Sequence, residues 1–117
     1  MKKPVFAGVC TAIITPFSLD GGIDYARFSQ LLDLQIAAGI DAVCVCGTTG
    51  ESATLRHEEQ LSLIDCAVKH VAGRCRVIAG TGSNDTATSL FLSQCARNLM
   101  SMHCLLFHRT TRLLNQD

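Results

Sequence analysis

Two adjacent threonines, Thr48 and Thr49, lie between glycines and are followed closely by Glu51. The residues before them, 42–46, form an apolar run typical of a buried strand. A turn at such a strand end presents backbone N–H groups and threonine hydroxyls, which suit a small carboxylate or carbonyl compound. Threonines in turns also cap local backbone groups. The position at a strand end favours a small-molecule site.

Other local motifs lack a residue that their chemistry requires. The 47–52 turn has no P-loop lysine, and Asp85 stands where a dinucleotide-binding fingerprint after Gly80 needs its third glycine. His57 begins a zinc-like motif, but Leu61 occupies the second histidine position. His57 is therefore interpreted either as a solvated residue of a first helical turn or as a ligand contact.

Composition limits the classes of partner. The chain has 117 residues, 48% of them hydrophobic and 17% charged, with net charge zero. A packed core is expected, and no basic face for nucleic acid. No apolar run reaches the roughly 18 residues of a membrane span, and the amino terminus does not resemble a signal peptide. We expect a cytoplasmic protein without a membrane partner.

The cysteines are interpreted as structural. There are seven, an odd number, and no two form a C-x-x-C pair. Most occupy apolar positions, where a free thiol behaves as a small hydrophobe in a reducing compartment. No metal site is expected, because zinc ligands need closer and more regular spacing.

Strand and helix patterns alternate along the chain. Apolar runs at 9–15, 42–46 and 76–79 predict strands, and periodic segments at 24–38, 58–71 and from about 84 predict helices. The predicted helix faces carry Phe28, Leu31, Leu32, Gln35 and Ile36, then Leu61, Ile64, Val68 and Val71, then Leu90, Phe91 and Cys95.

Uniformly apolar strands predict burial on both faces, and the helices between them suit right-handed crossovers. The spacing of about 33 residues also fits ankyrin repeats, but their Thr-Pro-Leu-His signature is absent. We therefore predict a parallel α/β sheet or barrel. Its polar residues gather after the strands, where such folds place their sites.

Three motifs resemble a known family: Thr15-Pro16-Phe17, the 47–55 segment, and residues 77–84 with Thr86. In order and spacing, Val5 to Ala96 is similar to the amino-terminal third of the 4-hydroxy-tetrahydrodipicolinate synthase family, within the pyruvate-dependent aldolase and N-acetylneuraminate lyase group. The resemblance implies part of a (β/α)8 TIM barrel, here about three βα units and an irregular tail. It implies a lyase that condenses pyruvate with L-aspartate 4-semialdehyde through a lysine Schiff base, in lysine (diaminopimelate) biosynthesis.

Site roles follow from the same resemblance. Thr48 matches the catalytic hydroxyl of a Tyr-Thr-Tyr proton relay, and Thr49 matches the residue that holds the pyruvate carboxylate. A threonine hydroxyl donates and accepts at once, so it can pass a proton between two phenols. The resemblance implies no cofactor, and a homo-oligomer that is often a tetramer.

An allosteric lysine site of some members maps onto Ser52, Ala53, His57 and Asn84. Thr88 stands where lysine-sensitive members carry a glutamate. Because that carboxylate would pair with a ligand ammonium, lysine inhibition is not expected.

The resemblance stops after Ala96. We interpret 1–96 as the family part and 97–117 as a frameshifted tail, because a two-nucleotide shift in one permitted back-translation restores the family's Pro-Tyr-Tyr segment. The tail histidines and arginines are given no role, and 104–107 are expected to attempt a fourth strand.

The family's Schiff-base lysine and relay tyrosines have no match here. The only lysines are Lys2, Lys3 and Lys69. We therefore expect the chain alone to be inactive and, with its barrel interior uncovered, to be marginally stable or dependent on a partner. The alternatives are a non-catalytic remnant or partner of a full-length homologue, and another pyruvate aldolase such as N-acetylneuraminate lyase. Threonines rather than serines in the 47–51 turn favour the synthase.

Overall fold

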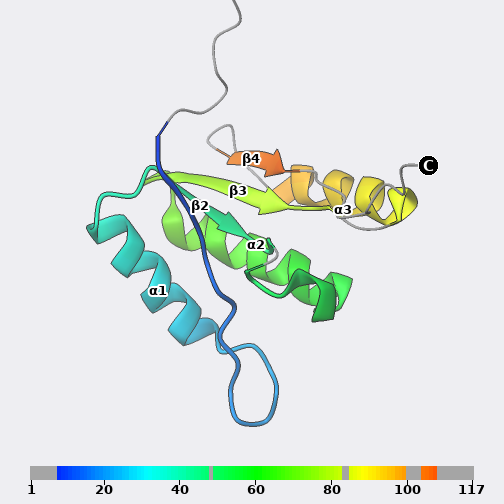
Figure 1. Ribbon diagram of the computed structural model, residues 1–117, viewed down its shortest axis with the longest axis horizontal. Helices are drawn as coiled ribbons and strands as arrows, with labels where there is room; N and C mark the ends of the chain where they lie inside the picture. Colours follow the sequence, from blue (N-terminus) through cyan, green and yellow to red (C-terminus); the bar gives the residue numbers. More distant parts are fainter. Residues whose placement is uncertain (1–7, 48, 83–84, 100–103, 108–117) are drawn as a thin grey trace, which may run out of the picture.

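The computed structural model describes residues 8–47, 49–82, 85–99 and 104–107, in which strands and helices alternate (Figure 1). The elements are β1 (Cys10–Ala12), α1 (Tyr25–Ala37), β2 (Ala42–Val45), the 3-10 helix η1 (Ser52–Thr54), α2 (His57–Val71), β3 (Arg76–Gly80), α3 (Thr86–Leu99) and β4 (Cys104–Phe107). The predicted order is confirmed. The fourth strand expected at 104–107 is present as well.

The four strands form one parallel sheet in the order β1-β2-β3-β4. Thr11 lies opposite Val43, and Val43 lies opposite Val77, so the register continues across the sheet. A helix follows each of the first three strands. Sequential parallel strands with intervening helices are the repeating units of a (β/α)8 barrel, and the chain has this fold in part.

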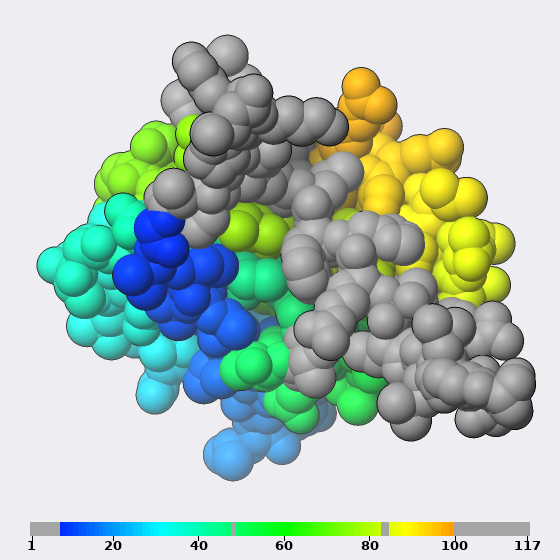
Figure 2. Space-filling view, turned by 45° about the horizontal axis from the view of Figure 1, so that its top comes forward, coloured from blue at the N-terminus to red at the C-terminus, as the bar shows by residue number. Residues whose placement is uncertain are grey.

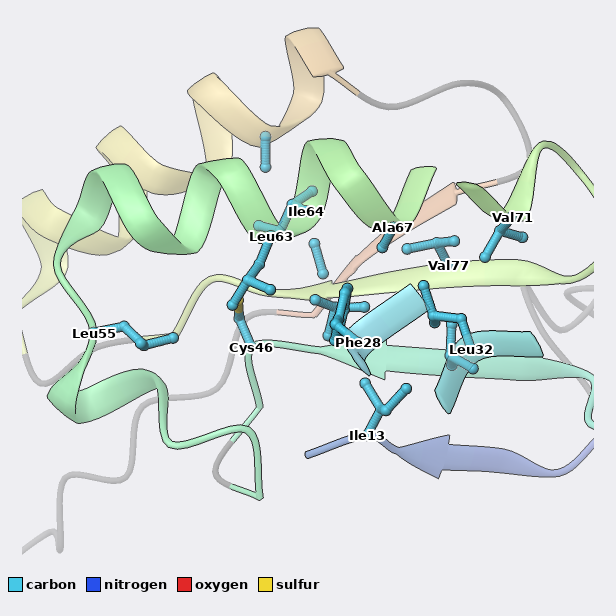
Figure 3. Close-up of a cluster of buried hydrophobic side chains, with 14 residues drawn as sticks. Ile13, Phe28, Leu32, Cys46, Leu55, Leu63, Ile64, Ala67, Val71 and Val77 are labelled. Atoms are coloured by element: carbon cyan, nitrogen blue, oxygen red, sulfur yellow. The ribbon is translucent and has the colours of Figure 1, made fainter. Parts of the chain in front are cut away.

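One face of the sheet is buried beneath α1 and α2, and the hydrophobic core lies between these layers (Figure 3). Phe28 and Leu32 of α1 have no exposed surface, and neither does Leu63 of α2. The strands and the residues directly after them contribute six buried residues to this cluster, namely Ile13, Val43, Val45, Cys46, Val77 and Ala79. The predicted face of the first helix therefore packs against the sheet. Of the face predicted for the second helix, Ile64 and Val71 are buried and Leu61 and Val68 only partly so, while the buried Leu63 was not predicted.

The opposite face of the sheet, which we call the inner face, is exposed mainly along β1. In β1 and its extension, Cys10, Ala12 and Ile14 are exposed, with Ile14 at 52%. Cys44 of β2 and Ile78 of β3 are half-buried. Figure 2 shows atoms in the colours of β1, β2 and β3 reaching the surface side by side. The predicted burial on both faces is therefore confirmed for β2, where the neighbouring residues Ala42 and Val43 are both fully buried, and wrong for β1, where Cys10 and Ala12 are exposed.

The helix starts are capped by acidic side chains. The Asp24 carboxylate accepts the Arg27 N–H at 3.0 Å before α1. The Glu59 carboxylate accepts the Arg56 N–H at 2.9 Å at the start of α2. Such contacts satisfy N–H groups that have no partner within the helix.

The predicted face of α3 is wrong. Leu90 and Phe91 are 57% and 51% exposed, whereas Ser89, Leu92 and Ala96 are buried. The buried residues follow the i, i+3, i+7 spacing of one helix face. Ser89 and Ala96 are small, and Ser89 is also polar. A prediction based on large apolar residues therefore picks the neighbouring face of the helix.

Candidate active site

The turn after β2 departs from ordinary backbone geometry at two non-glycine residues. Cys46 has φ +60° and Glu51 has φ +58°. The left-handed region costs an L-residue roughly 1–2 kcal/mol. Such a turn persists only where its surroundings fix it, and three neighbouring elements contact it.

The extension of β1 holds the turn from one side. Thr15 is 4% exposed, and its hydroxyl donates to the Gly50 carbonyl at 2.7 Å. A Cβ on Gly50 would lie 3.2 Å from the Ile13 carbonyl oxygen and 3.3 Å from the Thr15 hydroxyl. The strand end and the turn are therefore closely packed, and a larger residue at position 50 would push them apart.

The end of β3 holds the turn from the other side. A Cβ on Gly80 would overlap the Cys46 carbonyl group and lie 3.1 Å from the Gly47 nitrogen. Only glycine allows this approach of two backbones. Gly80, which the sequence places only in a strand-end motif, therefore allows β3 to lie close to the turn.

Helix α2 contacts the turn through Gln60, which is 7% exposed. Its Nε2 donates to the Ser52 carbonyl at 2.7 Å and, more weakly, to the Leu55 carbonyl at 3.4 Å. The Cys46 thiol donates to the Gln60 backbone carbonyl at 3.6 Å. Sequence reasoning missed Gln60, because a glutamine near a helix start usually faces solvent.

These contacts place Thr49 at the carboxyl edge of the sheet, where it is exposed. Thr48 and Asn84 lie outside the described residues. Ser52 is half-buried and Ala53 is exposed, both within η1. The structure therefore places Thr49, Ser52 and Ala53 on one continuous segment between β2 and α2.

His57 is exposed at the first position of α2. Its ring lies 6.2 Å from the Phe91 ring, centroid to centroid, with the planes tilted by 45°. Both readings of His57 stay open, since a solvated first-turn residue and a ligand contact each fit this position. The contact nevertheless joins the start of α2 to α3.

Thr88 is occupied in capping α3. Its hydroxyl donates to the Asp85 carboxylate at 2.6 Å, and its backbone N–H does so at 3.2 Å. These hydrogen bonds, from the hydroxyl first, lower the pKa of Asp85. The Thr88 side chain therefore helps to cap the start of α3.

The thiols near the turn are poor nucleophiles. Burial, and then the nearby Cys44, raise the pKa of Cys46 to about 12. Burial, and then Cys10, likewise raise the pKa of Cys44. A thiol must ionise to attack. The structural interpretation of these cysteines fits this environment.

Neither a metal cluster nor a membrane span is found within the part of the chain that the structure describes. Its His, Cys, Asp and Glu side chains nowhere gather in threes around a possible ion. Its helices are too short or too polar to cross a bilayer.

An exposed threonine in a turn at the end of a parallel strand suits a small-molecule enzyme site. The sequence of the chain also matches a family of such enzymes. Residues 5–107 match the model of the Dihydrodipicolinate synthetase family. The chain belongs to this family.

Individual relatives agree with this assignment. The chain is 46% identical over 99 residues to the 4-hydroxy-tetrahydrodipicolinate synthase of Acetivibrio thermocellus, covering 85% of this chain and 34% of that protein. The crystal structure of dihydrodipicolinate synthase from Aquifex aeolicus superimposes with a TM-score of 0.80 at 44% identity, over 86% of this chain and 34% of that one. YagE of Escherichia coli K12, a prophage protein of the dihydrodipicolinic acid synthase family solved with pyruvate, gives 0.85 at 27% identity, over 97% and 38%.

The dihydrodipicolinate synthetase family member described here thus spans about a third of the length of the curated relatives it matches. The match to the family model passes the boundary expected at Ala96 and ends at residue 107, where β4 ends.

Proposed function

We propose that this chain is part of a 4-hydroxy-tetrahydrodipicolinate synthase, which condenses pyruvate with L-aspartate 4-semialdehyde in lysine biosynthesis. The observation that carries the proposal is the 47–51 turn, which three elements hold at the carboxyl edge of a family barrel with Thr49 exposed. Parallel α/β folds bind small molecules at this edge.

In this proposal Thr49 binds the pyruvate carboxylate through its hydroxyl and the adjacent backbone. A carboxylate accepts several hydrogen bonds, and a turn with converging N–H groups offers them. Thr48 is proposed to relay a proton between two phenol groups that other parts of the enzyme supply. No cofactor is required for this chemistry.

The Schiff-base lysine must come from outside the described residues. Lys69 lies on α2 with its side chain 74% exposed, and its Nζ contacts the Asp65 carboxylate at 2.9 Å. An imine-forming lysine must reach the pyruvate carbonyl, whereas Lys69 lies on the surface of a helix in an ion pair. We propose that the 117-residue chain forms no imine by itself.

Regulation by lysine is proposed to be absent. The candidate allosteric residues Ser52, Ala53, His57 and Asn84 match the family's lysine site. The carboxylate that would hold the lysine ammonium is replaced by Thr88, whose hydroxyl already donates to Asp85.

We also propose a cytoplasmic location and a frameshift in the tail. A cytoplasmic location suits the free thiols of Cys10, Cys44, Cys46, Cys66 and Cys95. The frameshift proposed within 97–117 is tested by the nucleotide sequence downstream of the Ala96 codon: an open frame without an insertion or deletion relative to related genes would refute it.

The function is tested by replacing the corresponding segment of the Acetivibrio thermocellus synthase with residues 5–96, which precede the proposed frameshift. We expect the chimera to condense the two substrates and to trap pyruvate covalently upon borohydride reduction, whereas the 117-residue chain gains no mass. In the chimera, Thr49→Ala is expected to raise the KM for pyruvate by about tenfold to a hundredfold, the value of one or two hydrogen bonds to a charge. Thr49→Ser is the matched control and keeps the hydroxyl. A folded chimera without activity, or an unchanged KM in Thr49→Ala, contradicts the proposal.

A further inference from the structure

Gln60 of α2 contacts both ends of the 47–51 turn. Its backbone carbonyl accepts the Cys46 thiol at 3.6 Å, and its side-chain Nε2 donates to the Ser52 carbonyl at 2.7 Å. Cys46 directly precedes the turn, and Ser52 directly follows it. One buried residue therefore anchors the chain both where it enters the turn and where it leaves it.

Backbone hydrogen bonds connect Ser52 to the rest of the turn. The Gly47 carbonyl accepts the Gly50 N–H at 3.1 Å and the Ser52 N–H at 3.4 Å. Residues 47–52 are thus joined into one hydrogen-bonded unit. A shift of Ser52 relative to α2 therefore also moves the backbone on both sides of Thr49.

The side chain at position 60 must donate hydrogen bonds to fulfil this role. The Leu55 carbonyl lies 3.4 Å from the same Nε2 that contacts the Ser52 carbonyl, so two acceptors face one atom. A primary amide nitrogen carries two N–H donors and suits this arrangement. A side chain without a donor would leave the Ser52 carbonyl without this partner and would allow the segment to move away from α2.

We propose that Gln60 is a positioning residue for pyruvate, because it fixes the Thr49 hydroxyl by anchoring the turn to α2. The inference rests on the proposed function, in which Thr49 binds the pyruvate carboxylate. Hydrogen bonds to a bound carboxylate depend steeply on distance and angle, so a small displacement of the turn weakens them. The effect of Gln60 is smaller than that of Thr49 itself, since Thr15 and Gly80 also hold the turn.

Gln60→Leu in the chimera that carries residues 5–96 tests the role through pyruvate binding. Leucine is similar in size but has no donor, and we expect the KM for pyruvate to rise about threefold to tenfold, the value of one neutral hydrogen bond. In the Thr49→Ala chimera the same substitution should raise the KM by a smaller factor, because the hydroxyl that Gln60 positions is already missing. Two effects that multiply in full would mean that Gln60 acts independently of Thr49, which overturns the inference.

Gln60→Glu adds a pH profile, which a loss of stability alone would not produce. A protonated carboxyl can donate to the Ser52 carbonyl, whereas an ionised one cannot. Burial beside two carbonyl oxygens raises the pKa of a carboxyl at this position above its ordinary value of about 4.3. The adjacent Cys46 thiol stays neutral, since burial, and then Cys44, raise its pKa to about 12. We therefore expect the KM for pyruvate, divided by that of the parent chimera, to fall as the pH is lowered from about 8 to about 6. The titratable groups of 56–59 at the start of α2 are common to both proteins, so this ratio removes their own effect.

Val71→Ala is the control for lost stability, because Val71 is buried at the opposite end of α2 from the turn (Figure 3). It should lower the melting temperature and leave the KM for pyruvate unchanged. An unchanged KM in folded Gln60→Leu, or a Gln60→Glu ratio that does not vary with pH, overturns the inference and leaves the proposed function intact. An unchanged KM in Thr49→Ala instead overturns the proposed function, and the inference with it. If Gln60→Leu does not fold, the pH profile of Gln60→Glu decides.

Discussion

Individual residues in the 47–51 turn store backbone strain that distant residues compensate. Cys46 and Glu51 have positive φ, while Thr15 and Gly80 fix the turn from β1 and β3. The hydroxyl of Thr15 and the bare backbone of Gly80 act at sequence separations of about 35 residues. The geometry offered to a ligand at Thr49 is therefore a property of the assembled sheet.

Gly80→Ala tests this dependence. Its Cβ would overlap the Cys46 carbonyl group, so strand and turn must separate, and we expect a loss of about 1–3 kcal/mol in the free energy of unfolding, as for other overpacked sites. The urea midpoint measures this loss. Gly47→Ala is the matched control, since its Cβ would meet only the Cys44 sulfur, at an ordinary 3.4 Å. Equal midpoints for both variants would contradict the role assigned to Gly80.

The sequence predicts the exposed threonine of the turn but not the residues that hold the turn in place. Thr49 is recognisable because it follows a second threonine between glycines at the end of a predicted parallel strand. Gln60 is not recognisable, because its partners at Ser52 and Leu55 are set by how α2 approaches η1. No local pattern encodes that approach.

At the scale of elements, α1 and α2 are joined at the surface by a polar network. The Asp33 carboxylate of α1 contacts His70 Nε2 at 2.8 Å and the Arg74 guanidinium at 3.2 Å. Arg74 also donates to the His70 carbonyl at 2.8 Å. The hydrogen bond from His70, and then that from Arg74, lower the pKa of Asp33. One exposed carboxylate therefore links two helices whose apolar faces already pack.

Asp33→Asn tests the link through its pH dependence. Because folding lowers the pKa of Asp33, its contribution is present above the unfolded value of about 3.9 and is lost as the pH falls through the folded value. We expect a lower urea midpoint for the variant at pH 7, and a difference from the parent chain that vanishes in acid. Asp65→Asn is the control, since Asp65 pairs only with Lys69 of its own helix. A difference that does not change with pH would refute the assignment.

Element type and order are predictable here because each segment carries a clear period. The predicted helix at 24–38 corresponds to α1, and that at 58–71 to α2, each within a residue at either end. The face of α3 is not predictable, because Ser89 and Ala96 lie buried while Leu90 and Phe91 are exposed. Burial of small residues depends on how closely α3 packs, which the apolar count does not register.

At the scale of the whole molecule, the main core of the described residues lies on one side of the sheet. Helices α1 and α2 cover this outer face, and Phe28, Leu32 and Leu63 are fully buried there. Thiols on the two sides of the sheet can therefore report on the core and on the inner face separately.

Alkylation at pH 8 separates them, because Cys10 lies on the exposed inner face and Cys46 in the buried core. Burial, and then the nearby Cys44, raise the pKa of Cys46 to about 12, so little of its thiol ionises at that pH, and only the thiolate reacts. We expect peptide mass spectrometry to show Cys46 modified at least about 100-fold more slowly than Cys10, and to show urea removing the difference. Native Cys46 reacting as fast as Cys10 would place the thiol outside the core and contradict the packing described for the turn.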